Sequence, residues 1–127
     1  MLHHVEINVS NLKRSRKFYD ALLPVMGYNL YQEWEQGFSY KFDATYLVFV
    51  QTVEKHLNSA YHRGQTGLNH LAFHAQSRQQ VDEITEMLEA LGTTILYKDR
   101  HPFASGSSVY AVFFEDPDRL KLEVVAP

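Results

Sequence analysis

Two histidines in the segment "GLNHLAFHA" are the first residues whose type and spacing could do chemistry. His70 and His74 stand four residues apart, the spacing of two zinc ligands on a helix. The segment itself, however, alternates and is rich in strand-forming residues, which is typical of a half-buried strand. On a strand the two side chains would lie about 13 Å apart, too far for one metal ion. We therefore expect His70 to be the candidate ligand and His74 to line a cavity.

The same pattern occurs near the N-terminus, in "HHVEINVS", and it reveals an internal repeat. Aligning His4 with His70 brings Gly27 to within one residue of Gly92 and Tyr31 opposite Tyr97. Each copy then reads as a strand, a helix, a glycine and three further strands. The expected later strands are 28–33, 37–43 and 45–51 in the first copy, and 94–98, 108–114 and 119–125 in the second.

This repeat predicts an α+β fold of two βαβββ modules. A lone copy of this size would be only marginally stable, so we expect both to share a core in a single domain, 1–127. Module one would span 1–52, a polar linker 53–65, and module two 66–127.

Alternation along the strands places several polar side chains on one face of each sheet. Val5, Ile7 and Val9 should face the helix, which leaves His4 and Glu6 on the other face and His3 on the helix side. The same reasoning puts His70 and His74, and then Lys121 and Glu123, on the face away from the second helix. Sheets that curl into a cup would bring His4, His70 and Glu123 together.

Composition excludes several classes of function. Hydrophobic residues make up 45% of the 127-residue chain and charged residues 21%, as in a globular protein. A net charge of −3 without a basic run argues against nucleic acid as a partner. The absence of cysteine excludes disulfides, thiolate catalysis and Cys-ligated zinc. Neither a signal peptide nor a membrane span is recognisable, so we expect a cytoplasmic protein.

The segments "HHVEINVSNLKRSRKFYDALL", "GLNHLAFHA" and "FFEDPDRLKLEVV" resemble the vicinal oxygen chelate superfamily, which includes glyoxalase I, bleomycin-resistance proteins and extradiol dioxygenases. The resemblance covers nearly the whole chain. It implies two βαβββ modules that form a cup-shaped mixed sheet around a divalent metal. It also implies His4, His70 and Glu123 as metal ligands, and a homodimer in which two chains complete one another's sites.

Two departures from the family pattern bear on activity. Glyoxalase I has a fourth ligand, a carboxylate, on the last strand of module one, and here that strand, "TYLVFVQTV", holds no acid. Phe49 or Gln51 falls at the expected position, and only Gln51 could ligate, through its amide oxygen. The extradiol motif needs a histidine and a tyrosine before the "DP" turn, where this chain has Phe113 and no histidine nearby.

Two imidazoles and one carboxylate suit Fe(II), Mn(II), Ni(II) or Zn(II) and leave positions open for a chelating substrate. Glu6 is the candidate general base. The alternative is that its carboxylate is only ion-paired or hydrogen-bonded and takes no part in catalysis. Arg100, His101 and Lys121 could hold an anionic substrate, although the first two also fit a solvated loop. Phe49, His74 and Tyr110 would line the pocket. For the two aromatic residues, Phe49 and Tyr110, a place in the hydrophobic core is the alternative.

Two classes of function stay open. The first is a small metalloenzyme of lyase, isomerase or dioxygenase type that acts on an oxygen-chelating small molecule. The alternative is a metal-free protein that sequesters a small molecule or drug, as bleomycin-resistance proteins do. The His/His/Glu set favours the enzyme, because a pure binder has no need of it.

Overall fold

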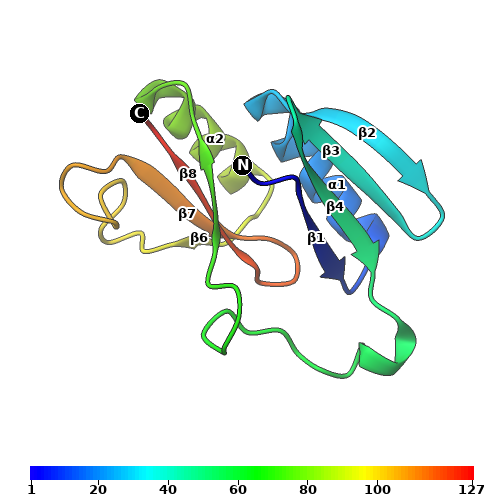
Figure 1. The fold of residues 1–127 in the computed structure, drawn as a ribbon. Coiled ribbons are helices and arrows are strands. Elements are labelled where there is room, and N and C mark those ends of the chain that lie inside the picture. Colours follow the sequence, from blue (N-terminus) through cyan, green and yellow to red (C-terminus); the bar gives the residue numbers. More distant parts are fainter. The chain divides into compact units, whose positions relative to one another are not determined.

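A computed structural model describes all residues, 1–127, and its connectivity is βαβββ twice over (Figure 1). Module one contains β1 (His4–Val9), α1 (Leu12–Leu22), a 3-10 turn (Pro24–Met26), β2 (Asn29–Trp34), β3 (Gly37–Phe42), β4 (Thr45–Gln51) and a second 3-10 turn (Glu54–His56). Module two contains β5 (Leu71–His74), α2 (Arg78–Ala90), β6 (Ile95–Leu96), β7 (Ala111–Glu115) and β8 (Lys121–Val125). The predicted α+β class and the two βαβββ modules are confirmed.

The two modules repeat the same sheet topology. The strand order is β1-β4-β3-β2 in one and β5-β8-β7-β6 in the other. The first and last strands of each module pair in parallel and the remaining pairs are antiparallel, so both sheets are mixed. The chain divides into two compact units, Met1–Ala60 and Tyr61–Pro127. That both belong to one domain stays a prediction.

Both helices begin where the sequence supplies a capping side chain. The Asn11 side chain accepts a hydrogen bond from Arg14 N, and the Ser77 hydroxyl accepts one from Gln80 N. The Gln80 side chain also accepts a hydrogen bond of 2.7 Å from Gln76 N, the residue before the cap, and so satisfies a further backbone donor at this end of the helix. After α1 the chain makes one 3-10 turn that begins at Pro24 and ends at Gly27, which has a left-handed φ of 89°.

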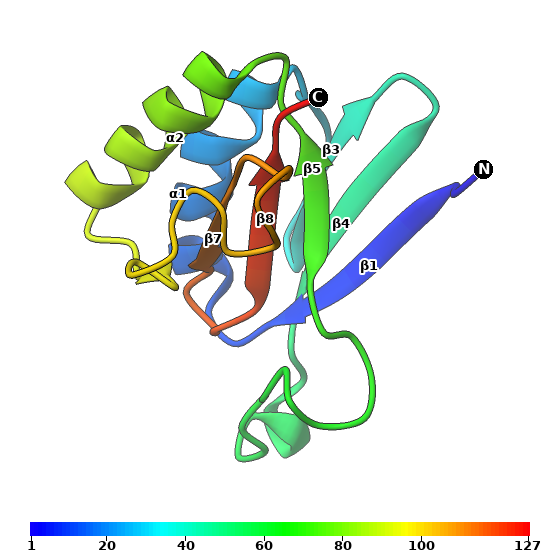
Figure 2. The same cartoon turned by 90° about the vertical axis from the view of Figure 1, so that its left-hand side faces the viewer.

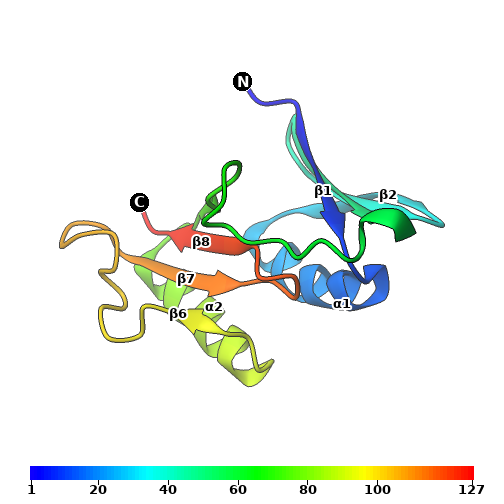
Figure 3. The ribbon, with the colours of Figure 1, turned by 90° about the horizontal axis from the view of Figure 1, so that it is seen from below.

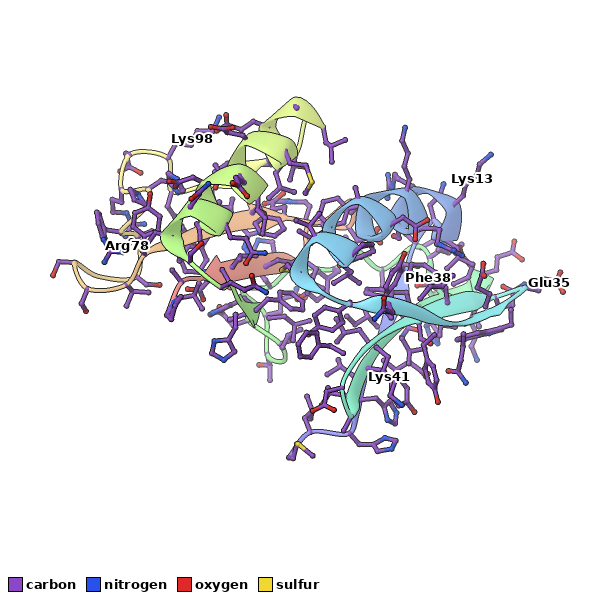
Figure 4. All side chains as sticks on the ribbon, turned by 90° about the horizontal axis from the view of Figure 1, so that it is seen from above. Lys13, Glu35, Phe38, Lys41, Arg78 and Lys98 are labelled. Carbon is purple, nitrogen blue, oxygen red and sulfur yellow. The ribbon has the colours of Figure 1, made fainter.

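Each helix covers one face of its own sheet, as Figures 2 and 3 show for α2 against β7 and β8. In module one the rings of Tyr19 and Phe49 lie 4.0 Å apart between α1 and β4. Phe38 of β3 joins them from below the helix, whereas Lys41 on the same strand points to the other side (Figure 4). We call the face turned away from a module's own helix its helix-free face.

The expected alternation is confirmed in both modules. Glu6 is exposed on the helix-free face of β1, while its neighbours Val5 and Ile7 are half-buried. In module two Leu122 and Val124 are fully buried toward α2. Parity is therefore a sound guide to which side chains share a face.

Candidate functional site

His70 and Glu123 lie side by side on the helix-free face of module two. His70 immediately precedes β5, and Glu123 lies in β8, where it pairs with Ala72. The two side chains approach to 3.3 Å between His70 Nε2 and Glu123 Oε2. Because β8 is an inner strand of the sheet, only 9% of the Glu123 side chain is exposed to solvent. A carboxylate buried to this degree needs a cation or hydrogen-bond donors beside it.

Asn69 fixes the orientation of the His70 ring. The Asn69 side-chain oxygen lies 2.7 Å from His70 Nδ1 and, as an acceptor, places a proton on that nitrogen. In a neutral ring Nε2 then carries a lone pair directed at the carboxylate oxygen. Two lone pairs at this distance repel each other unless a cation or a second proton lies between them. The pair therefore calls for either a bound metal ion or an imidazolium.

This donor set fits a divalent metal. Zn–N and Zn–O bonds of about 2.1 Å at a tetrahedral centre place two donors roughly 3.4 Å apart. The separation of 3.3 Å between His70 Nε2 and Glu123 Oε2 agrees with that value. A ligating histidine also usually donates its other ring N–H to an oxygen, as His70 does to Asn69.

His4, the third predicted ligand, lies in module one with a comparable ring arrangement. The His4 ring stacks on that of Tyr46, with ring centres 4.8 Å apart and an angle of 8° between the ring planes. His4 Nδ1 lies 2.7 Å from His3 Nδ1. The second nitrogen, Nε2, has no protein partner. His3 is not on the helix side as parity predicted, because β1 begins only at His4 and alternation does not extend beyond the strand. Its ring instead lies 5.3 Å from that of Tyr46.

Strand register corrects the expected position of the missing carboxylate. Glu6 stands two residues after His4 and pairs with Val48, just as Ala72 stands two after His70 and pairs with Glu123. Val48 is thus the counterpart of Glu123, and neither Phe49 nor Gln51 occupies that position. The reason is parity, since both of those residues lie on the helix side of β4. Module one has its acid on β1, at Glu6, and an apolar residue opposite it.

Phe49 and Gln51 have structural roles. Phe49 is fully buried in the core beneath α1. Gln51 Oε1 accepts a hydrogen bond of 2.9 Å from Leu12 N, and its Nε2 donates one of 2.9 Å to Ser10 O. The amide therefore satisfies the first turn of α1, and we leave both residues out of the proposed site.

The remaining predicted residues lie in module two but not all on one face. Lys121 lies on the helix-free face with Glu123, and its Nζ donates to the hydroxyl oxygen of Tyr97 at 2.8 Å. Arg100 is exposed beside the same ring, and His74 is exposed at the end of β5. Two further predicted residues lie elsewhere.

Tyr110 contacts α2, and His101 lies in the loop that follows β6. The Tyr110 hydroxyl donates to Asp82 of α2 at 2.6 Å, and Arg78 lies over its ring, so this side chain belongs to the helix side. The hydrogen bond to Asp82 raises the pKa of Tyr110. His101 is half-buried in the loop after β6, and its Nδ1 is buried without a hydrogen-bond partner.

Sequence reasoning missed three residues that the structure brings to this face. Asn69 orients His70, and the only sequence signal was its position directly before that histidine. Phe113 lies in register with Glu123 and 5.9 Å from the His70 ring. For Tyr97 the only signal in the sequence was its alignment with Tyr31 in the internal repeat. No group of three or more potential metal-ligating side chains comes together within either module, and no helix has the length and hydropathy to cross a membrane.

A family model described as the Glyoxalase/Bleomycin resistance protein/Dioxygenase superfamily matches residues 1–124. The chain belongs to this superfamily. The resemblance predicted from the histidine and glutamate motifs is therefore confirmed.

Relatives of this glyoxalase-superfamily chain match it over its whole length. A Bacillus subtilis (strain 168) protein, the uncharacterized protein YqjT, is 56% identical over 99% of this chain and 98% of its own length. The crystal structure of a proposed glyoxalase from Bacillus halodurans is 59% identical, with a TM-score of 0.98 over 100% of this chain and 96% of the other. A glyoxalase/bleomycin resistance protein from Albidiferax ferrireducens T118 is 25% identical, with a TM-score of 0.75 over 100% and 98%.

Proposed function

We propose that this glyoxalase-superfamily protein is a metal-dependent enzyme that acts on a small molecule with two neighbouring oxygen atoms. The observation that supports the proposal is the His70–Glu123 pair, with donors 3.3 Å apart and the ring oriented by Asn69. His4 is the proposed third ligand. Zn(II), Ni(II), Mn(II) and Fe(II) all accept two imidazoles and a carboxylate.

A divalent metal held by these residues supplies Lewis acidity toward the two substrate oxygens, which stabilises negative charge as it develops there. The chain itself supplies the proton chemistry. Glu6 is exposed on the same face of β1 as His4, about 7 Å further along the strand, and its carboxylate can accept a proton from a carbon next to a carbonyl. Isomerisations and eliminations next to a carbonyl begin with such a transfer, and we place the protein in this group ahead of the dioxygenases. The missing extradiol histidine and tyrosine support that order.

The competing function is metal-free sequestration of a small molecule. In that case His70 would be protonated and would donate to both Asn69 and Glu123 as an imidazolium. Aromatic side chains available for such binding lie on β2, where Tyr31 is 48% exposed and Trp34 44%. This alternative predicts the same contacts around His70 but no requirement for a metal.

Metal titration of the apo protein separates the two functions. Protein stripped of metal would be titrated with Mn(II), Ni(II) and Zn(II) by calorimetry, alongside the variants His70→Ala, Glu123→Gln and His4→Ala. His74→Ala is the matched control, because His74 is an exposed histidine at the other end of the same strand. We expect one metal per binding site, with a large loss of affinity in the three ligand variants and little change in the control.

Two results would contradict the proposal. If the parent protein takes up none of the metals stoichiometrically, sequestration becomes the better explanation. If His74→Ala loses as much affinity as His70→Ala, binding is non-specific and the assignment of ligands fails.

A further inference from the structure

We propose that Tyr97, Lys121 and Arg100 form an anion-binding subsite on the helix-free face of module two. The proposal rests on the proposed function and narrows its substrate to a molecule that carries a carboxylate or phosphate group beside its chelating oxygens. Lys121 Nζ donates to the Tyr97 hydroxyl oxygen at 2.8 Å. The Arg100 guanidinium carbon lies 4.8 Å from the centre of the same ring. One phenol is thus flanked by two cations.

The charge of Lys121 is not neutralised by a carboxylate. Its cross-strand partner in β7 is Glu115, an acid that could have formed an ion pair with it. Glu115 instead pairs with Arg63 at 2.8 Å and with Arg119 at 3.6 Å. Lys121 keeps two ammonium hydrogens without an acceptor, and Arg100 is also without an ion pair. The Tyr97 hydroxyl accepts from Lys121 and so retains its own proton as a third kind of donor.

Only the ring of Phe113 lies between the subsite and the His70–Glu123 pair. Phe113 lies in register with Glu123, with its ring 5.9 Å from that of His70 and 5.4 Å from that of Tyr97. Lys121 Nζ lies 5.1 Å from the Phe113 ring centre. A small molecule resting on Phe113 can therefore reach His70 and Glu123 with one end and the cations with the other. An apolar floor with polar groups at its edges is the usual composition of a small-ligand site.

Tyr97 also has a backbone conformation that its side chain disfavours. Its φ is 55°, in the left-handed region that few residues other than glycine adopt. The turn that follows is closed by hydrogen bonds of 2.9 Å from Arg100 N and His101 N to Tyr97 O. This turn is what brings Arg100 back beside the ring. A tyrosine at a position where glycine would cost less, and placed between two cations, fits a function of its side chain.

The test measures anion binding to metal-free protein, so that its outcome is independent of the metal titration. Protein treated with a chelating resin would be titrated with inorganic phosphate, and separately with acetate, at constant ionic strength and followed by two-dimensional NMR. We expect saturable shifts of the Tyr97, Arg100 and Lys121 amide signals with at least one anion. Phosphate alone indicates a tetrahedral anionic group on the substrate, and acetate alone a carboxylate.

Variants identify the donors. Lys121→Met and Arg100→Gln should each raise the dissociation constant roughly tenfold, as expected for loss of one charge-assisted hydrogen bond. Arg100 is exposed, so its replacement tests the proposal even if Lys121→Met fails to fold. Lys98→Met is the matched control, because this exposed lysine carries the same charge at the edge of the module (Figure 4).

The subsite would be refuted if neither anion shifts these signals saturably. It would also be refuted if Lys98→Met weakens binding as much as Lys121→Met does. Either result concerns the anion subsite alone, because no metal takes part in the measurement.

Discussion

Replacing Gln51 by methionine separates a structural role of its amide from a metal-binding one. The change keeps the length of the side chain and removes two hydrogen bonds of 2.9 Å, from Leu12 N and to Ser10 O, together with a longer one of 3.3 Å to Thr52 O. Each of the two shorter bonds contributes about 1 kcal/mol net, so the variant should lose at least about 2 kcal/mol of unfolding free energy. For a chain of this length that loss corresponds to a Tm lower by roughly 8 °C.

Thermal unfolding followed by circular dichroism measures this loss, and metal titration of the same variant completes the experiment. Gln65→Met is the control, since Gln65 is exposed in the linker region and its replacement should change stability by less than about 0.5 kcal/mol. We expect Gln51→Met to bind metal as the parent does. An unchanged Tm with a large loss of metal affinity would refute the reasoning and make Gln51 a ligand after all.

Four further outcomes are expected. Asn69→Ala should weaken metal binding about 10- to 100-fold in calorimetry by freeing the His70 ring, and a change of less than about twofold would deny it a positioning role. Coupled assays with a methylglyoxal–thiol adduct should show little or no turnover, because Val48 replaces the carboxylate on the last strand of module one; robust turnover would refute this and point to Glu6. Burial, with a hydrogen bond to Asp20, raises the pKa of Tyr40 from 10.0 to about 12. The folded state therefore holds the Tyr40 proton more tightly than the unfolded state. Its contribution to the unfolding free energy is complete below about pH 10 and disappears as the pH rises toward about 12. Urea unfolding should thus show a steeper loss of unfolding free energy at alkaline pH in the parent than in Tyr40→Phe. Light scattering should give a homodimer, twice the 14.8 kDa of one chain, and a monomer at micromolar concentration would contradict it.

Most of the secondary structure could be predicted because its signals are local. The predicted 37–43 and 45–51 became Gly37–Phe42 and Thr45–Gln51, since alternation and turn residues mark both ends. The predicted 94–98 shrank to Ile95–Leu96. The left-handed backbone of Tyr97 ends that strand early, and a tyrosine gives no sign in the sequence of adopting it.

The candidate site could be predicted only in part. The face on which a strand residue lies follows from the local sequence, whereas the register between two strands does not. Parity alone put His70 and Glu123 on one face, and the structure brings them together. Which residue of β4 corresponds to Glu123 depends on how β4 pairs with β1, and counting along the chain gave Phe49 or Gln51 instead of Val48. Long-range pairing of this kind is set by turns and hydrophobic faces together, which a single segment does not encode.

The exchanged positions of acid and apolar residue in the two modules, Glu6 opposite Val48 and Ala72 opposite Glu123, have a consequence for protein engineering. A chimera built from two copies of module two would carry a last-strand carboxylate in both halves, whereas one built from two copies of module one would carry none. The two halves are therefore no longer interchangeable parts. Converting the first half to the pattern of the second takes only two codons, Glu6→Ala and Val48→Glu, and moves one carboxylate sideways by a single strand spacing of about 4.8 Å. A library that varies this one cross-strand pair would sample both arrangements on an otherwise unchanged scaffold.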